Sequence, residues 1–300
     1  MIVQILLSAL ALLAAVFVIA LGRQAVKRQQ MLPTLEAVAL GAVTNFFDTL
    51  GIGSFAPTTA WIRMRRMVPD SYIPAVLNVG HALPTVAEAL IFVTLVKVDP
   101  WLLGACIAAA IVGAVVGAPI VLRLPLRAVQ AVVGLALLAA AATFVVKNLH
   151  MMPGGGDALR LPPEAFAIAV GGFFVFGALM MCGIGLFAPS LILLPLLGMN
   201  PTAAFPIMMG ACAFLMPVSG FQFLRSERID LRVVIGFALG GIPAVLVAAF
   251  VVKSMPLEAL RWGVVVVVLY AAATLIWSAL RPAKMVAEQT SKLGSEHAPN

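Results

Sequence analysis

The sequence GIGSFAPT at residues 51–58 returns 132 residues later as GIGLFAPS at residues 183–190. Prolines elsewhere keep the same interval, which pairs Pro69 with Pro201 and Pro74 with Pro206. At an interval of 131 residues, AAAT at 140–143 returns at 271–274. Apolar composition alone does not place an octet and several prolines in register. The sequence therefore indicates an internal duplication.

The composition is that of a membrane protein. Of the 300 residues, 63% are apolar and only 19 are basic and 12 acidic, whereas soluble domains are roughly 45–50% apolar. So few charges exclude a soluble enzyme, a nucleic-acid-binding protein and a disordered chain. The apolar residues form long continuous runs without alternation, so we expect membrane-spanning helices and no β-barrel.

The apolar runs give the expected spans. Residues 1–21 carry no charge, and basic residues follow them, which is the reverse of a secretory signal. We therefore expect an uncleaved span with the N-terminus outside. The further runs fall at 36–62, 72–96, 101–122, 128–146, 165–198, 202–224, 233–252 and 259–280.

Together these features predict an all-α polytopic membrane protein made of two inverted repeats. Each repeat begins with a broken helix pair, either re-entrant or of two short spans, because each piece is shorter than the roughly 30 Å hydrocarbon core. Three transmembrane helices follow in each repeat, and an extra N-terminal transmembrane helix precedes both. The predicted segments are the N-terminal helix with its basic loop (1–30), repeat 1 (31–147), a linker (148–163), repeat 2 (164–280) and a polar tail (281–300).

The loop charges favour broken segments that return to their own side. In that arrangement 14 of the 19 lysines and arginines lie inside, against 12 if each broken segment crosses once. The positive-inside rule therefore favours the first arrangement, which puts the C-terminus in the cytoplasm and gives the repeats opposite orientations. Inverted repeats with corresponding broken helices are typical of secondary transporters.

The breaks themselves predict an anion site. Gly51 and Gly53 allow a tight turn, and Pro57 falls in the first turn of the next half-helix, where its missing N–H does no harm. The free N–H groups and the dipole at such a helix start attract an anion. Gly183 and Gly185 predict a matching end, and inversion brings the two together near the membrane centre. The alternative is that these glycines merely let helices pack closely.

Two acidic residues, Asp48 and Glu88, lie deep inside apolar runs, where ionisable groups are functional candidates. Burial favours the neutral form of a carboxyl group, so either residue is a candidate carrier of a coupling proton. The alternative is a buried hydrogen-bonded pair between helices. Polar neighbours share their helix faces, and the predicted substrate-binding residues are Asn45, Gly51, Gly53, Ser54, Thr58, Asn78, His81, Gly183, Gly185 and Ser190.

The sequence offers little for a metal, a cofactor or catalysis. Cys106, Cys182 and Cys212 each lie in an apolar run without metal-ligand spacing, so we expect no metal site, no disulfide and no cofactor. Zinc-protease and serine-hydrolase motifs are absent. A dyad of Ser54 with His81 is the one enzymatic alternative, and we expect no enzyme.

The repeated Gly-Ile-Gly, its spacing to the later prolines and the stretch IPAVLNVGHALPT at 73–85 resemble the TauE/SafE family, also called the toluene-sulfonate uptake permease family. The resemblance covers about residues 36–280. It implies a protein of the bacterial cytoplasmic membrane that transports sulfite, sulfonates or related sulfur-containing anions, often outward. Much of the family has further glycines after Gly-Ile-Gly, where this chain has Ser54-Phe55 and Leu186-Phe187.

The resulting prediction is a secondary transporter, an exporter of sulfite or organosulfonates in the inner membrane. Its expected partners are a small anion and the lipid bilayer, with no nucleic acid, and a homo-oligomer stays open. The alternatives are a transporter or channel for another small anion, a carboxylate, an amino acid or a cation.

Overall fold

The computed structural model describes residues 2–117, several positions between 127 and 145, and residues 158–181, 183–226, 228–254 and 257–280. Residues 148–157 of the expected linker, the expected tail at 281–300 and Cys182 lie outside these residues. Within them the chain is helical apart from turns and one isolated bridge, from Ala158 to Met199.

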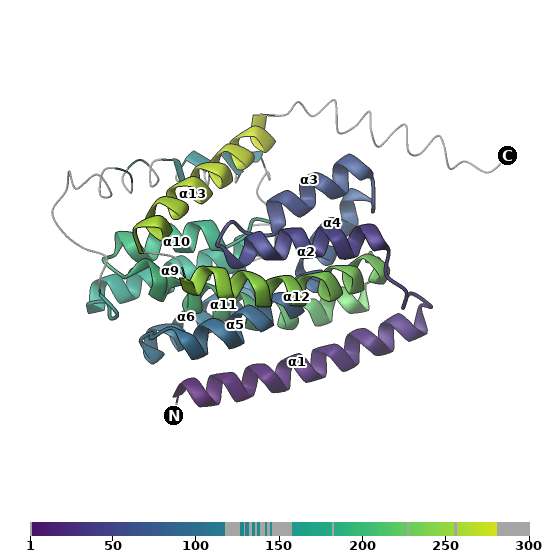
Figure 1. Ribbon diagram of the computed structural model, residues 1–300, viewed down its shortest axis with the longest axis horizontal. Helices are drawn as coiled ribbons and strands as arrows, with labels where there is room; N and C mark the ends of the chain where they lie inside the picture. The colour runs from purple at the N-terminus through teal and green to yellow at the C-terminus, as the bar shows by residue number, and fades with distance from the viewer. Residues whose placement is uncertain are drawn as a thin grey trace.

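The helices follow the predicted apolar runs, apart from the run at 128–146, which lies largely outside the described residues. Most of them lie along the longest axis of the molecule (Figure 1). Their bounds are α1 Ile2–Lys27, α2 Leu35–Thr49, α3 Phe55–Arg65, α4 Ile73–Gly80, α5 Ala82–Leu95, α6 Pro100–Val112, α9 Pro163–Met180, α10 Phe187–Leu196, α11 Pro201–Arg225, α12 Leu231–Ser254 and α13 Leu257–Leu280. A 3-10 turn, η1, at Asp70–Tyr72 precedes α4, and a π-helical turn, η2, at Gly113–Gly117 continues α6.

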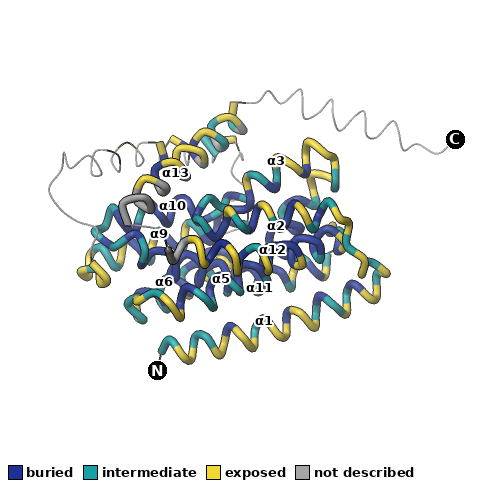
Figure 2. The backbone as a smooth tube through the Cα atoms, viewed as in Figure 1, coloured by how far each residue is buried: buried dark blue, intermediate teal, exposed yellow. Residues whose placement is uncertain are grey.

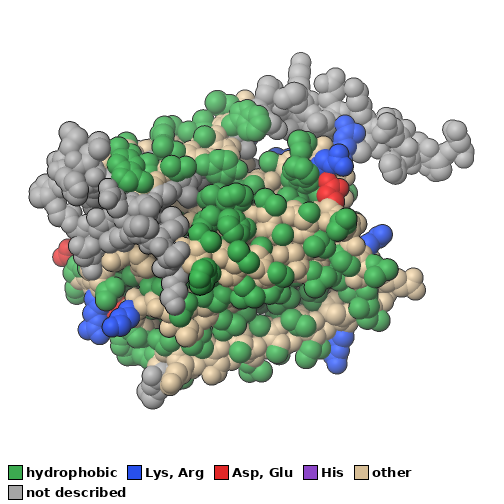
Figure 3. Space-filling model, in the orientation of Figure 1, with side chains coloured by type: hydrophobic (Ala, Val, Ile, Leu, Met, Phe, Trp, Pro, Cys, Tyr) green, Lys and Arg blue, Asp and Glu red, His purple; other side chains and the backbone are tan. Residues whose placement is uncertain are grey.

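The surface and the helix lengths are those of a multi-pass membrane protein. Five helical segments in the described part are long and apolar enough to cross a membrane: Ile2–Lys27, Asp70–Leu95, Pro163–Met180, Pro201–Arg225 and Leu231–Val251. On the face shown in Figure 3, charged side chains lie at the two ends and apolar side chains cover the area between them. The all-helical membrane class predicted from composition is therefore confirmed.

Two helical hairpins take the place of the two interrupted apolar runs. In the first, the guanidinium Nε of Arg65 near the end of α3 lies 2.9 Å from Oε1 of Glu36 at the start of α2. In the second, Ala158 ahead of α9 exchanges backbone hydrogen bonds with Gly198 and Asn200 beyond α10. In each hairpin the chain therefore returns to the end of the bundle from which it started.

Contacts between loops identify the two ends of the bundle. At one end, the guanidinium of Arg28 donates to the carbonyl oxygens of Leu224 and Ser226, at 3.0 and 2.9 Å, which joins the α1–α2 and α11–α12 loops. At the other end, Arg160 ahead of α9 lies 3.8 Å from Asp99 ahead of α6.

Close backbone contacts at glycines hold the central helices together. A methyl group in place of the hydrogen at Gly240 of α12 would lie 1.9 Å from the carbonyl oxygen of Val38 in α2. At Gly177 of α9 it would lie 2.1 Å from the carbonyl oxygen of Ala110 in α6. Small residues permit this approach in membranes. Each contact joins a helix of the first half of the chain to one of the second.

Helix α1 lies along the outside of the bundle and keeps much of its surface exposed (Figure 2). Its main anchor is Phe17, whose ring lies against Gly220 of α11 and meets the ring of Phe221 edge-on at 5.6 Å. The outward side chains, such as Leu12, are apolar, as expected for contact with lipid.

The segment from residue 73 to 95 is two helices with a break at His81. Pro84 has no N–H to offer the carbonyl of Gly80, one turn earlier, and its ring crowds that carbonyl. The break between the two helices therefore falls at Gly80 and His81, and His81 is fully buried.

Candidate functional site

The two breaks have the same backbone geometry. In the first, the N–H of Gly51 donates to the carbonyl of Asp48 at 2.8 Å and that of Ile52 to Phe47 at 3.0 Å. The residues 132 positions later make the same two bonds, at 3.0 and 3.2 Å. These paired bonds form the Schellman motif, which ends a helix with a left-handed residue. Gly51 and Gly183 have φ of +94° and +82°, so glycine is required at both positions.

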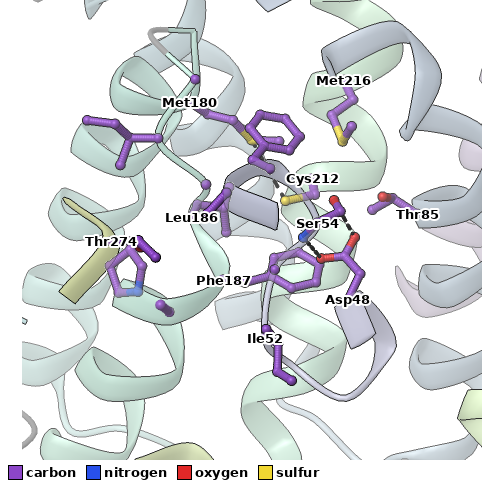
Figure 4. Close-up of a pocket in the computed structure, with 18 of the residues that line it drawn as sticks. Asp48, Ile52, Ser54, Thr85, Met180, Leu186, Phe187, Cys212, Met216 and Thr274 are labelled. Atoms are coloured by element: carbon purple, nitrogen blue, oxygen red, sulfur yellow. Dashed lines mark hydrogen bonds between the residues drawn. The ribbon is translucent and has the colours of Figure 1, made fainter. Parts of the chain in front are cut away.

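A cavity of about 70 Å³ lies between the starts of α3 and α10, and we call it the central cavity (Figure 4). The first break lines it with Asp48, Gly53 and Ser54, and the second with Gly183 and Gly185. Helices α5 and α11 close its sides. The volume is enough for a few water molecules or one small ion.

Reciprocal contacts relate the two sides of the central cavity. A methyl group on Gly53 would lie 3.9 Å from Cβ of Phe187, and one on Gly185 would lie 3.8 Å from Cβ of Phe55. Gly53 and Gly185 are 132 residues apart, and so are Phe55 and Phe187, so the interval converts one contact into the other. The two breaks therefore face each other in the same way from both sides.

Asp48 makes the two breaks chemically different. Its Oδ1 accepts the backbone N–H of Ser54 at 2.7 Å and its Oδ2 accepts the Ser54 hydroxyl at 2.9 Å, as Figure 4 shows. The carboxyl group thus covers the N–H of Ser54, the residue that precedes α3, while no side chain caps the first turn of α3 itself. At the matching positions of the second break stand Met180 and Leu186, and no side chain caps α10. The N–H groups of the first turn of α10 have no partners within their helix.

A buried network around His81 joins four elements. Its Nδ1 lies 3.0 Å from Oδ1 of Asn45 in α2, and its Nε2 lies 3.1 Å from the hydroxyl of Thr58 in α3. The amide nitrogen of Asn45 donates to the carbonyl of Gly41 at 2.7 Å, so its oxygen faces the ring. Nδ1 therefore carries the hydrogen and Nε2 accepts from Thr58. The ring also stacks on Phe237 of α12, with centroids 5.0 Å apart.

Glu88 is fully buried beside Thr49. The Thr49 hydroxyl lies 2.7 Å from Oε1 of Glu88 and 2.9 Å from the carbonyl oxygen of Asn45. Oε2 of Glu88 has no hydrogen-bond partner in the described part of the chain. None of the buried side chains in that part is Lys or Arg. The interior around both carboxyl groups therefore supplies no positive side chain to balance a charge.

The predicted site residues fall into two groups. Asp48, Gly53, Ser54, Gly183 and Gly185 line the central cavity. The others lie behind this lining, and they are Gly51 in the turn, Asn45, Thr58 and His81 in the buried network, and Asn78, Glu88 and Ser190 elsewhere in the interior. Because the Ser54 hydroxyl bonds Asp48 and both ring nitrogens of His81 have other partners, the described contacts leave these two side chains without a dyad.

The prediction did not include several residues that line the central cavity. Thr85 of α5 is one, and its buried hydroxyl has no hydrogen-bond partner in the described part of the chain. The sequence placed Thr85 on the helix face of Glu88, which was the available signal. Met180, Cys212 and Met216 also line the cavity, but apolar residues in apolar runs give no such signal. Within the described ranges, no three His, Cys, Asp or Glu side chains group as metal ligands.

Comparison with known proteins identifies the second half of the chain. The sequence model of the family described as sulfite exporter TauE/SafE matches residues 158–298, which include α9 to α13. No curated protein and no solved structure matches the chain. The match covers the second half of the resemblance seen in the sequence and names a family of membrane transporters. The family prediction is thus confirmed for this region, since residues 158–298 match the sulfite exporter TauE/SafE family.

Proposed function

We propose that this protein is a secondary transporter that exports small sulfur-containing oxyanions, such as sulfite or organosulfonates. Two findings support the proposal: the match to the sulfite exporter family and the central cavity between two helix starts. Helix starts favour anions through free N–H groups and the helix dipole, without a buried Lys or Arg. We expect the protein to bind no cofactor and to catalyse no reaction.

The proposal includes two inverted repeats. Their hairpins are fastened at opposite ends of the bundle, since the second begins beside Arg160 and Asp99 while the first begins after the loop that holds Arg28. The reciprocal contacts of Phe55 and Phe187 support the same relation. Inverted halves around a central site are the arrangement from which alternating access arises.

We place the anion nearer to α10 than to α3. Ahead of α3 the Asp48 carboxyl already holds both donors of Ser54, whereas Met180 stands at the matching position ahead of α10 and offers no charge. Across the central cavity, Thr85 presents a hydroxyl that has no partner among the described residues. A small oxyanion would accept hydrogen bonds from the N–H groups of α10 and from Thr85 together.

The contacts of Asp48 and Glu88 support a further part of the proposal, that anion transport is coupled to a proton. An ionised Asp48 repels an anion held at the start of α10, because Asp48 and the start of α10 line the same cavity, whereas a protonated Asp48 does not. Glu88 fits a proton already: the Thr49 hydroxyl has one hydrogen and two oxygens within reach, so a proton on Glu88 satisfies both contacts. We propose that Asp48 exchanges the coupling proton and that Glu88 holds one in reserve.

The orientation belongs to the proposal as well. Most described lysines and arginines outside the spans lie at the bundle end that holds Arg28 and Arg225, so the positive-inside rule puts this end in the cytoplasm. The N-terminus is then outside and the C-terminus inside, in the inner membrane. The proposed partners are the lipid bilayer and the small anion. The proposal makes no choice between a monomer and a homo-oligomer.

The observation that carries the proposal is the pair of helix starts facing one cavity. We would reconstitute the purified protein in liposomes and measure uptake of sulfite and several sulfonates, with and without a pH gradient. Chloride and an amino acid serve as controls. We expect saturable, counterflow-competent sulfur-anion flux that changes with the gradient. Flux that follows a cation gradient, or that never saturates, would instead support the cation-carrier or channel alternative.

A further inference from the structure

A second cavity, of about 450 Å³, lies between α4, η2, the end of α9 and α11, and we call it the loop-side cavity. It reaches the bundle end where the α1–α2 and α11–α12 loops meet. Its polar lining residues are Ser71, Ser219, Gln222, Ser226 and Arg228. None of the described residues that line it is acidic, so its charged group favours an anion.

One face of α11 connects the two cavities. Cys212 and Met216 line the central cavity, and Ser219, Phe223 and Ser226 line the loop-side cavity. Successive members of this series are three or four residues apart, so they lie along one side of the helix. From Cys212 to Ser226 the series spans roughly 21 Å, which is more than half of the roughly 30 Å hydrocarbon core.

Two methionines separate the cavities. Met180 of α9 and Met216 of α11 are almost completely buried in the lining of the central cavity, while the next residue of the chain after Met180, Met181, lines the loop-side cavity. The thiol of Cys212 lies 3.8 Å from the sulfur of Met180, which brings α9 and α11 into contact there. Unbranched thioether side chains change rotamer easily, so a barrier made of them opens without backbone movement.

We propose that the loop-side cavity is the cytoplasmic vestibule through which a small anion reaches the central cavity, with Arg228 collecting the anion and Met180 and Met216 forming the gate. This inference rests on the proposed function for the identity of the anion. The route itself depends only on the two cavities and the helix face that joins them. It assigns the conformation described here to the inward-facing side of the transport cycle.

The route can be tested without transport, by thiol labelling. In a variant in which the three cysteines are replaced by alanine, Ser219→Cys introduces one thiol in the vestibule. We expect methanethiosulfonate ethylsulfonate, an anionic and membrane-impermeant reagent, to modify it in inverted membrane vesicles. It should react about tenfold faster than the cationic trimethylammonium analogue once their rates toward a free thiol are factored out, because Arg228 attracts the anion.

The matched control is Leu224→Cys, on the opposite face of α11 and equally buried. It should resist modification under the same conditions. Equal modification of the two thiols, or modification of Ser219→Cys only in right-side-out vesicles, would overturn the vestibule. Replacing Arg228 by Gln should remove the preference for the anionic reagent, and an unchanged preference would overturn its role as collector.

The gate is tested with the native thiol of Cys212, retained after Cys106→Ala and Cys182→Ala. We expect Met216→Ala to raise the rate of its modification from the cytoplasmic side by about tenfold, because the barrier opens more readily. Met208→Ala, at a buried methionine of the same helix that lines neither cavity, should leave the rate unchanged. Equal rates in both variants would overturn the gate, whatever the flux measurements in liposomes show.

Discussion

Asp48 is the residue at which the two breaks differ most. Its carboxyl oxygens hold both donors of Ser54, and Met180 takes its place in the second break. A carboxylate near a helix start takes the place that a bound anion would have. Asp48 therefore fills the site ahead of α3, whereas the similar site ahead of α10 has no such group. Under the proposed function, we expect the affinity of the central cavity for the anion to depend on whether Asp48 carries a proton.

Asp48→Asn should retain the fold and lose the pH dependence of transport. The amide oxygen still accepts the Ser54 N–H, but the side chain stays neutral at every pH. Wild-type flux should rise as the pH falls, because protonation removes the repulsion between Asp48 and the anion, whereas the variant should be insensitive to pH. A sulfonate is the suitable substrate for this measurement in liposomes, since it remains ionised throughout.

Glu88→Gln is the companion variant and addresses the second carboxyl group. A flat pH profile of transport in both variants, each with an unchanged melting temperature, would support a role for the two residues together. An unaltered pH profile in both would contradict proton coupling through either residue.

Thr85→Val should separate binding from stability. The substitution removes a buried hydroxyl that has no partner among the described residues, so the melting temperature should stay the same or rise slightly. If the hydroxyl donates to the anion, the KM for sulfonate should rise about tenfold, as expected for a lost hydrogen bond to a charged group.

Thr44→Val is the control for Thr85, because its buried hydroxyl already bonds the carbonyl of Leu40 at 2.8 Å. That variant should leave the KM unchanged. A KM that stays at the wild-type value in Thr85→Val as well would remove Thr85 from the site.

Among the helices, close backbone contacts at glycines join the first half of the chain to the second, and we call these contacts the glycine seams. Gly240→Val should destabilise the contact of α12 with α2, because the new side chain meets the carbonyl oxygen of Val38. Overpacking of this kind costs about 1–3 kcal/mol, so we expect a clear fall in the melting temperature in detergent. Gly104→Val, at a helical glycine with open space around it, should have little effect. Similar melting temperatures for both variants would show that the seam is not rigid.

The sequence was informative at the element scale wherever backbone chemistry decides the structure. Gly51 and Gly183 were expected to turn the chain, and both have the positive φ that only glycine adopts easily. Repeated residues gave repeated geometry because short-range hydrogen bonds depend on local sequence. The pairing of His81 with Asn45 and Thr58 was not predicted, since it joins residues far apart along the chain.

At the scale of the whole molecule, composition alone predicted the all-helical membrane class, and the repeated octet led to the family. Composition could not show that Asn45, Thr58 and His81 satisfy one another behind the cavity while Thr85 faces it. Side chains of similar polarity on one helix face have different partners, and the neighbouring helices decide which. The substrate-binding and proton-coupling roles of the predicted residues therefore remain predictions.

Orientation is a prediction about the whole molecule. Single cysteines at Arg225 and Lys97, at opposite ends of the bundle, should react with an impermeant maleimide from opposite sides of the membrane. Arg225→Cys should react in inverted vesicles and Lys97→Cys in right-side-out vesicles, because basic residues gather at the cytoplasmic end. Reaction of both from one side would contradict the arrangement of spans, and exchanged sides would reverse the orientation.

The packing of each half of the chain against the other has a consequence for biosynthesis. Helix α2 packs on α12, and α6 packs on α9, so each half of the chain completes the other. The first half leaves the ribosome before α9 and α12 exist. Until those helices are made, we expect the faces of α2 and α6 that pack against them to be covered only by lipid. We therefore expect assembly to be a late event, and a nascent chain that stalls before α12 to be more sensitive to membrane proteases than the complete chain.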